Sequence, residues 1–182
     1  MPTPDFIRDL RRHVGTAELW IPAVRAVVVR RRADGRVLPS PEVLLVKRSD
    51  DGAWTVTAGI LEPGEDPADG AIREVQEETA LTACPVRVAG VFAHGPVEYA
   101  NGDRCRYLDT VFEMETLDGE PRVNDDESVD VGWFPVTALP ESLAEDQRMV
   151  IGWALDAGAP AQFTEPGTSH AEAAGEPAAQ HD

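Results

Sequence analysis

Short apolar runs, separated by polar turns, predict strands on both sides of one central helix. The runs that suit buried or half-buried strands lie at 24–29, 43–46, 54–57, 86–92, 105–115 and 129–134. Helical periodicity appears in three places: from Thr3-Pro4-Asp5 to Gly15, from 67 to about 80, and from about 141 to 156. This order predicts an α/β (α+β) fold in which a mixed β-sheet is sandwiched between α-helices.

The pattern divides the chain into three parts. Residues 1–19 form an N-terminal helical segment, and residues 20–157 form the main domain. Residues 158–182 contain seven alanines, three glycines, three prolines and four acids but no lysine or arginine, and only Phe163 offers an apolar anchor. We therefore expect this acidic tail to be disordered. The stretch 59–64, between the third run and the central helix, is expected to be a loop.

Composition narrows the classes of partner. The 182 residues carry 33 acids against 16 bases, a formal net charge of −17, and such a surface disfavours binding to nucleic acid. No apolar run reaches the ~18 residues that span a bilayer, and the N-terminus lacks the apolar segment of a signal peptide. The two cysteines, Cys84 and Cys105, match no disulfide framework or zinc spacing. A cytoplasmic protein without a membrane partner is expected.

The central helix places three acids close together. Glu74, Glu77 and Glu78 span an arc of about 100° at the helical spacing of 100° per residue. Glu74 and Glu78 form an i,i+4 pair of like charges, which costs roughly 0.2–0.5 kcal/mol. The helix dipole also disfavours anions in the last turns. A solvated acidic face would explain three glutamates alone. A hard cation such as Mg²⁺, which prefers oxygen ligands, would also explain why no base is placed there.

The spacing of residues 59–81 favours the cation site over the solvated face, because it resembles the Nudix box. The pattern of that box is G-x5-E-x7-R-E-U-x-E-E-x-G-U, where U is bulky and apolar. Eight of its nine specified positions are filled, by Gly59, Glu65, Arg73, Glu74, Val75, Glu77, Glu78 and Leu81. The box covers about an eighth of the chain, and the resemblance extends to roughly residues 20–156. The chain is similar to mutator-type and ADP-ribose pyrophosphatase-like Nudix hydrolases, and looks most like actinobacterial members.

Two positions depart from the family pattern. Ala80 stands where the box has its last glycine, and a left-handed alanine costs roughly 1 kcal/mol. We therefore expect the turn after the helix to differ locally. Thr57-Ala58-Gly59 stands where relatives often have Pro-Gly-Gly. The residue before the first box glycine supplies a backbone carbonyl to the metal in similar enzymes, and Ala58 can supply one equally well.

The resemblance implies roles for individual residues. Mg²⁺, with Mn²⁺ as a possible substitute, is the implied cofactor. The implied metal ligands are Ala58, Glu74, Glu77 and Glu78. The implied catalytic group contains Glu77, Glu78, Arg73, Glu65 and Glu127, in which Glu65 and Arg73 form an orienting ion pair.

The reaction implied by the resemblance is attack of water on phosphorus in a diphosphate. A carboxylate accepts the proton, either in the box or on a distant loop. The candidates outside the box are Glu98, Asp125, Asp126 and Glu127. Glu127 lies six residues before Trp133, much as an additional metal-associated glutamate does in mutator-type relatives, although a solvated turn explains 124–127 equally well.

The substrate pocket lies outside the box. Aromatic side chains could stack on a base and arginines could contact phosphate or ribose. The candidates are Trp54, Arg104, Arg106 and Tyr107. ADP-ribose, an oxidised nucleoside triphosphate, a dinucleoside polyphosphate and a nucleotide sugar all remain open.

Two rival functions share the fold. A non-catalytic Nudix-fold module that binds or senses a nucleotide would usually lack box carboxylates, and this chain retains them all. An isoprenoid diphosphate isomerase would need a catalytic cysteine and a catalytic glutamate in particular contexts, and Cys84 and Cys105 give no clear support for it. The sequence thus favours an enzyme with a small nucleotide-like diphosphate substrate, and the resemblance implies a homodimer.

Overall fold

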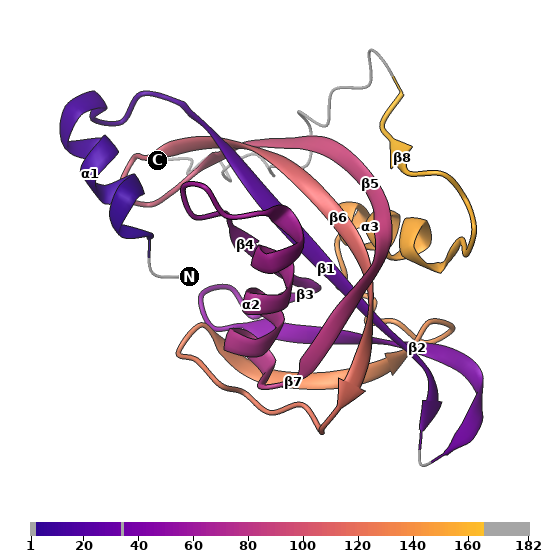
Figure 1. Cartoon of the computed structure of the whole chain (residues 1–182). Helices are drawn as coiled ribbons and strands as arrows, with labels where there is room; N and C mark the ends of the chain where they lie inside the picture. The colour runs from indigo at the N-terminus through magenta and orange to yellow at the C-terminus, as the bar shows by residue number, and fades with distance from the viewer. Residues whose placement is uncertain (1–2, 34, 166–182) are drawn as a thin grey trace, which may run out of the picture.

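The computed structural model describes residues 3–33 and 35–165, and it confirms the expected mixed sheet between helices. The elements in chain order are α1 (Asp5–Val14), β1 (Leu19–Ala33), β2 (Arg36–Arg48), β3 (Trp54–Thr55), β4 (Thr57–Ile60), α2 (Pro67–Thr79), β5 (Thr82–Glu98), β6 (Arg104–Asp118), β7 (Ser128–Pro135), α3 (Glu145–Leu155) and β8 (Gln162–Phe163). Figure 1 shows α2 on the near side of the sheet and α3 behind it. No helix among these residues is long and apolar enough to cross a membrane.

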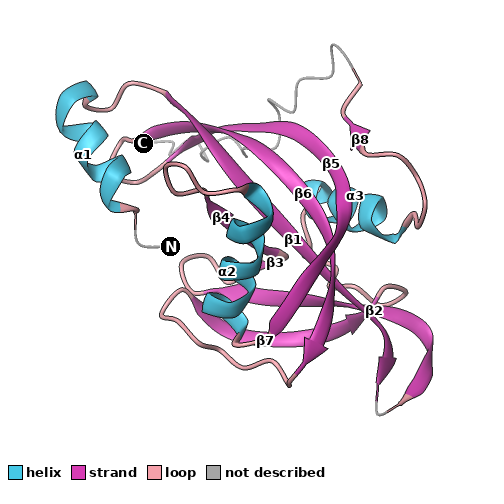
Figure 2. Cartoon of the chain, viewed as in Figure 1, coloured by secondary structure: helices cyan, strands magenta, loops and turns pink. Residues whose placement is uncertain are grey.

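The long strand β1 organises the sheet. The strand order is β3-β2-β1-β6-β5-β8, with β4 paired to β1 and β7 paired to β2. The first part of β1 pairs antiparallel with β4 and parallel with β6, and its last part pairs antiparallel with β2. The strand therefore belongs to two strand groups, which Figure 2 shows crossing in the lower part of the molecule.

Alternating side chains of β1 pack into two apolar cores, one beneath α2 and one beneath α3. Val24, Ala26 and Val28 pack in the cluster that also contains Ala71 and Val75 of α2. The intervening valines, at 27 and 29, pack in the cluster beneath α3. Because neighbouring side chains of a strand point to opposite faces, one apolar run anchors the helices on both faces.

Most strands extend beyond the predicted runs, and three further differences concern the loop before α2, the last helix and the tail. Gly59 and Ile60, expected in a loop, belong to β4, because β1 offers backbone partners that the sequence pattern does not reveal. The last helix begins at Glu145 rather than near 141. Part of the expected disordered tail is ordered: β8 pairs with Gly90 and Val91 through backbone hydrogen bonds, which require no apolar anchor. Residues 166–182 of that tail lie outside the described residues.

The turn after α2 keeps the left-handed geometry, so the prediction of a different turn is wrong. Ala80 has φ 58° and ψ 13°, and its N–H donates to the Gln76 carbonyl at 2.9 Å. It is the only non-glycine residue with positive φ in the described part of the chain. The fold therefore imposes a glycine conformation on an alanine.

Ala80→Gly should stabilise the protein by about 1 kcal/mol, because glycine adopts this conformation without the Cβ clash. For a protein of this size the melting temperature should rise by roughly 2–4 °C in a thermal denaturation scan. Ala68→Gly, in the first turn of α2 where the backbone is right-handed, is the matched control and should lower it. A fall in melting temperature for both variants would contradict the strain assigned to Ala80.

Candidate active site

The site forms where α2 packs over β4. Ala58 and Gly59 of β4 lie opposite Arg25 and Val24 of β1, so the backbone at this point is held by the sheet. A Cβ added at Gly59 would lie 1.9 Å from the carboxyl carbon of Glu74. The Glu74 carboxylate can therefore keep this position only while residue 59 is glycine, because it occupies the space that any side chain at 59 would fill.

Glu74 and Glu78 are buried although both are carboxylic acids. Their exposed fractions are 2% and 8%, whereas the side chain of Glu77 is 59% exposed. Burial raises the pKa of Glu74 to about 7, against the opposing effect of Arg73. Burial, followed by the charges of Glu74 and Asp125, raises the pKa of Glu78 well above its usual range. Both carboxylates therefore carry a desolvation penalty in the metal-free protein.

Arg73 joins the box residues into one network. Its Nε and Nη2 atoms donate to the two carboxylate oxygens of Glu65 at 2.8 and 2.9 Å, which forms the expected orienting pair. Its Nη1 donates to Glu74 at 2.7 Å and to Glu77 at 3.2 Å. The guanidinium holds the pKa of Glu65 below its usual value. Arg73 thus fixes the loop before α2 and partly compensates the charge on the helix.

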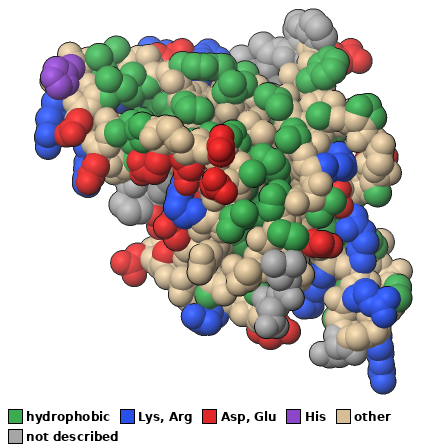
Figure 3. Space-filling model, viewed as in Figure 1, with side chains coloured by type: hydrophobic (Ala, Val, Ile, Leu, Met, Phe, Trp, Pro, Cys, Tyr) green, Lys and Arg blue, Asp and Glu red, His purple; other side chains and the backbone are tan. Residues whose placement is uncertain are grey.

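Glu78 lacks equivalent compensation. Its carboxylate accepts a hydrogen bond from the Ala58 backbone, but its Oε2 atom is buried without a hydrogen-bond partner. A buried carboxylate oxygen without a partner is costly, and such an atom in a folded protein calls for an explanation. Figure 3 shows acidic side chains gathered on the face that carries α2.

The carboxylate oxygens of α2 suit a hard cation, although their side chains do not converge on a single point. Among residues 3–33 and 35–165, no three histidine, cysteine, aspartate or glutamate side chains converge in metal-binding geometry. Arg73 contacts Glu74 and Glu77 instead. The donors are oxygens, two of the carboxylates are desolvated, and Glu78 Oε2 has no partner. This chemistry suits Mg²⁺, which binds one or two carboxylates together with water and substrate phosphate.

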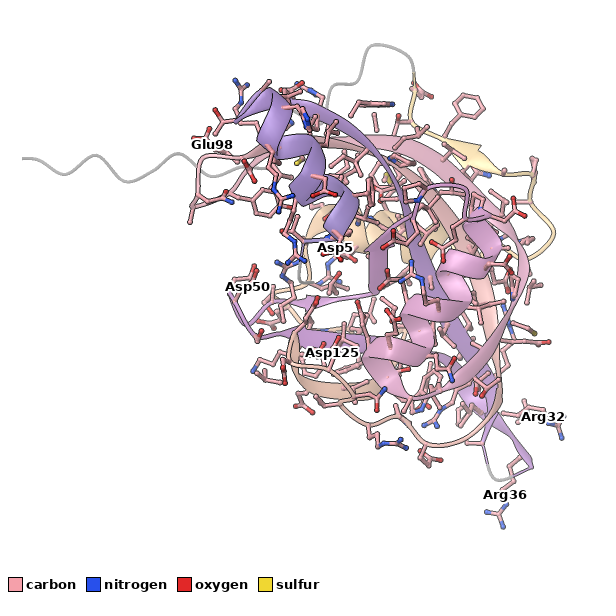
Figure 4. The ribbon with its side chains drawn as sticks, turned by 60° about the vertical axis from the view of Figure 1, so that its left-hand side comes forward. Asp5, Arg32, Arg36, Asp50, Glu98 and Asp125 are labelled. Carbon is pink, nitrogen blue, oxygen red and sulfur yellow. The ribbon has the colours of Figure 1, made fainter. Side chains whose placement is uncertain are left out.

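Asp125, on the loop before β7, is an acid whose charge acts on Glu78. The Oδ1 atom of Asp125 accepts the backbone N–H groups of Glu127 and Ser128, both at 3.1 Å. The Glu127 carbonyl accepts the N–H of Ser49 at 2.7 Å. Figure 4 shows Asp125 beside the end of α2, with Asp50 on a neighbouring loop. Sequence reasoning included Asp125 only as one of four alternatives; no sequence signal singles it out.

The four candidate substrate residues have protein partners of their own. Arg106 donates to Glu18 at 2.8 Å, and Arg104 pairs with the same carboxylate at 3.4 Å. The Tyr107 hydroxyl lies 2.6 Å from that of Tyr99, and Tyr107 is buried. Trp54 packs edge-on against Phe134, with their ring centroids 4.7 Å apart. Their assignment to a substrate pocket stays a prediction.

A buried polar cluster on the α3 side of the sheet was not predicted. Arg25 donates to Asp146 at 2.7 Å, lies 3.5 Å from Asp109 and covers the ring of Phe92. Arg25 and Asp109 are only 4% and 3% exposed. The signal was an arginine inside the otherwise apolar run 24–29, which cannot be buried without partners.

Comparison with known proteins agrees with this geometry. The NUDIX domain family matches residues 21–154. A MutT-like protein of Streptomyces ambofaciens is 33% identical over 138 residues, which are 76% of this chain and 79% of that protein. A MutT NUDIX hydrolase of Burkholderia pseudomallei has a similar solved structure, with 26% identity and a TM-score of 0.57 over 74% of this chain and 98% of that chain.

The chain belongs to the Nudix family. It is a Nudix hydrolase, an enzyme class that acts on phosphoanhydride bonds, as the box predicted. A nucleoside triphosphate pyrophosphatase/Nudix hydrolase fusion protein of Bifidobacterium longum is 34% identical over 96 residues. That match covers 50% of this chain but only 18% of the fusion protein, so the activity of the whole relative does not transfer.

Gly59→Ala should expel the Glu74 carboxylate from its place against β4. We expect activity to fall by about 10-fold or more, since the loss of an oriented metal-site partner typically has that effect. The metal-free melting temperature should change by only a few degrees, because the displaced atoms end a flexible side chain. Steady-state rates and thermal scans measure both quantities.

Gly152→Ala provides the control, because a Cβ at that helical position would meet nothing within 4 Å. It should retain full activity. Unchanged activity and metal dependence in Gly59→Ala would show that the position of Glu74 does not matter to the reaction.

Proposed function

We propose that the protein is a Mg²⁺-dependent hydrolase that cleaves the diphosphate bond of a nucleoside diphosphate linked to another moiety. The observation that carries this proposal is the pair of buried carboxylates on α2, of which one oxygen has no partner. A structural helix gains nothing from such a pair. A helix that binds a divalent cation and a phosphate does gain from the pair, because coordination to the cation offsets the desolvation cost of both carboxylates.

Each residue has a defined task in this proposal. Glu74, Glu77, Glu78 and the Ala58 carbonyl would hold the metal, which neutralises phosphate charge and activates water when bound. Arg73 and Glu65 keep α2 and the preceding loop in register. Water attacks one phosphorus, the bridging oxygen leaves with the other phosphate, and a carboxylate accepts the proton of the attacking water. Outside the box, the candidates for that carboxylate are Glu98, Asp125, Asp126 and Glu127, and the charge of Asp125 acts on Glu78.

The substrate class depends on residues outside the box. The box recognises the diphosphate, so the attached groups must be read by residues elsewhere. ADP-ribose, an oxidised nucleoside triphosphate, a dinucleoside polyphosphate and a nucleotide sugar fit the reaction equally. The presence of every box carboxylate supports an enzyme over a nucleotide-sensing module, because sensing alone does not require buried charges.

Assembly and location also belong to the proposal. Figure 3 shows apolar side chains along the uncovered part of the sheet beside α2. Trp20 of β1, Leu108 of β6 and Val91 of β5 are exposed, at 57%, 38% and 37%. Exposed apolar surface of this kind supports a homodimer. A cytoplasmic location and the absence of nucleic-acid partners stay predictions.

Glu78→Gln tests the proposal because it preserves shape and removes charge. Activity on a panel of the four substrate classes with Mg²⁺, with products identified by mass, should fall by on the order of 10²-fold or more. The metal-free variant should be at least as stable as the wild type, because an unpartnered, like-charged carboxylate is gone. Glu62→Gln, on the exposed loop before α2, is the control and should change neither quantity.

The opposite pattern would overturn the metal assignment. If Glu78→Gln destabilises the metal-free protein and leaves turnover intact, the glutamate is a structural partner. If the wild type cleaves no member of the panel with Mg²⁺ or Mn²⁺, the reaction class itself must be reconsidered.

A further inference from the structure

The carbonyl end of α2 is closed by one distant loop. The last four carbonyls of a helix lack partners within the helix and must find them elsewhere. In α2 these carbonyls belong to residues 76–79, which include Glu77 and Glu78, and the Gln76 carbonyl already accepts the N–H of Ala80. The last turn of α2 contains no basic residue that could compensate them.

Loop 119–127, between β6 and β7, supplies donors to all four carbonyls. The Asn124 side chain donates through Nδ2 to the carbonyls of Gln76 and Glu77, at 3.2 and 3.1 Å. Its backbone N–H donates to the Glu78 carbonyl at 3.3 Å. The Arg122 N–H donates to the Thr79 carbonyl at 3.0 Å. An amide nitrogen carries two hydrogens, so Asn124 can satisfy both side-chain acceptors together.

These contacts lie at the end of α2 where the electrostatic potential is least favourable for the two glutamates. The carbonyl end of a helix is negative, and it carries two glutamates that are also to bind a cation. N–H donors that point at these carbonyls reduce the negative potential and fix the end of the helix. Asp125, whose charge acts on Glu78, is the next residue of the same loop. The far end of the loop is tied to Ser49, whose backbone N–H and hydroxyl donate to the carbonyls of Glu127 and Asp126.

We propose that Asn124 is a positioning residue of the active site. It holds the carbonyl end of α2 and thereby sets Glu77 and Glu78 of the helix at a fixed distance from Asp125 of the loop. This inference rests on the proposed function, because it assigns to Asn124 an effect on the metal site. A cap that served stability alone would make the same hydrogen bonds but would leave metal affinity in the folded protein unchanged.

Direct Mn²⁺ binding separates the two roles. Free Mn²⁺ is measured by electron paramagnetic resonance, without substrate and at a temperature where every variant is folded. Asn124→Ala should raise the dissociation constant about 10-fold, the lower end of the effect expected when a partner that orients metal ligands is lost. Asn124→Ser, which keeps one donor, should lie between Asn124→Ala and the wild type. The substrate KM at saturating metal should stay within about twofold, while kcat at limiting metal falls.

Asn101→Ala is the matched control. Asn101 is the other asparagine of the chain, lies in an exposed turn and bonds Asp103 of the same turn. Its replacement should leave the Mn²⁺ dissociation constant within about twofold of the wild type. If Asn101→Ala and Asn124→Ala raise the Mn²⁺ dissociation constant equally, the effect is not specific to the end of α2 and the positioning role is wrong.

The outcomes also separate this inference from the proposed function. If the wild type binds Mn²⁺, Glu78→Gln weakens that binding and Asn124→Ala does not, then only the positioning role is wrong. A lower melting temperature for Asn124→Ala without a change in Mn²⁺ affinity would likewise mean that the cap serves stability alone. If the wild type binds no Mn²⁺, or if Glu78→Gln binds it equally well, the metal assignment fails and the inference fails with it.

Discussion

Two carboxylates held out of water between α2 and β4 are the constraint on which the rest of the site depends. Glu74 is packed against the backbone at Gly59, and Glu78 is nearly as deeply buried with one oxygen unpartnered. Neither position is favourable for a charge in isolation. Arg73 offsets part of the cost at Glu74 through a 2.7 Å hydrogen bond, and Glu65 fixes that guanidinium from the other side. The loop, strand and helix of the box are thus bound together by one arginine.

The wider fold serves to keep this arrangement in place. β1 holds β4 by backbone pairing and anchors α2 through alternate side chains, so the strand under the glutamates and the helix that carries them share one support. The loop before β7 closes the end of α2, and the left-handed Ala80 turns the chain toward β5. The strain at Ala80 and the burial of two acids indicate a site in which stability is given up for function.

The sequence predicted the parts that follow from periodicity and from fixed spacing. The central helix, the mixed sheet and the Glu65–Arg73 pair were all predicted, because helical spacing and the box pattern place those residues directly. It did not predict the burial of Glu74 and Glu78, since periodicity assigns charged positions to a solvated face. It also missed contacts between residues far apart in the chain, such as Asn124 with the end of α2 and Arg25 with Asp146. Such pairs depend on how the strands are ordered, which local patterns do not specify.

The melting temperature of the wild type, measured at several pH values with chelator and with saturating Mg²⁺, tests the central claim most directly. The pKa of Glu74 is raised to about 7 from its ordinary 4.5, so its contribution to metal-free stability is present below about pH 4.5 and is lost as pH rises through about 7. The burial of Glu78 acts in the same direction. Mg²⁺ binds the ionised carboxylates, so the increase in melting temperature caused by Mg²⁺ should still grow between about pH 5.5 and about pH 8. An increase that is absent, or that is already complete at about pH 5.5, would contradict the claim that the buried carboxylates form a metal site.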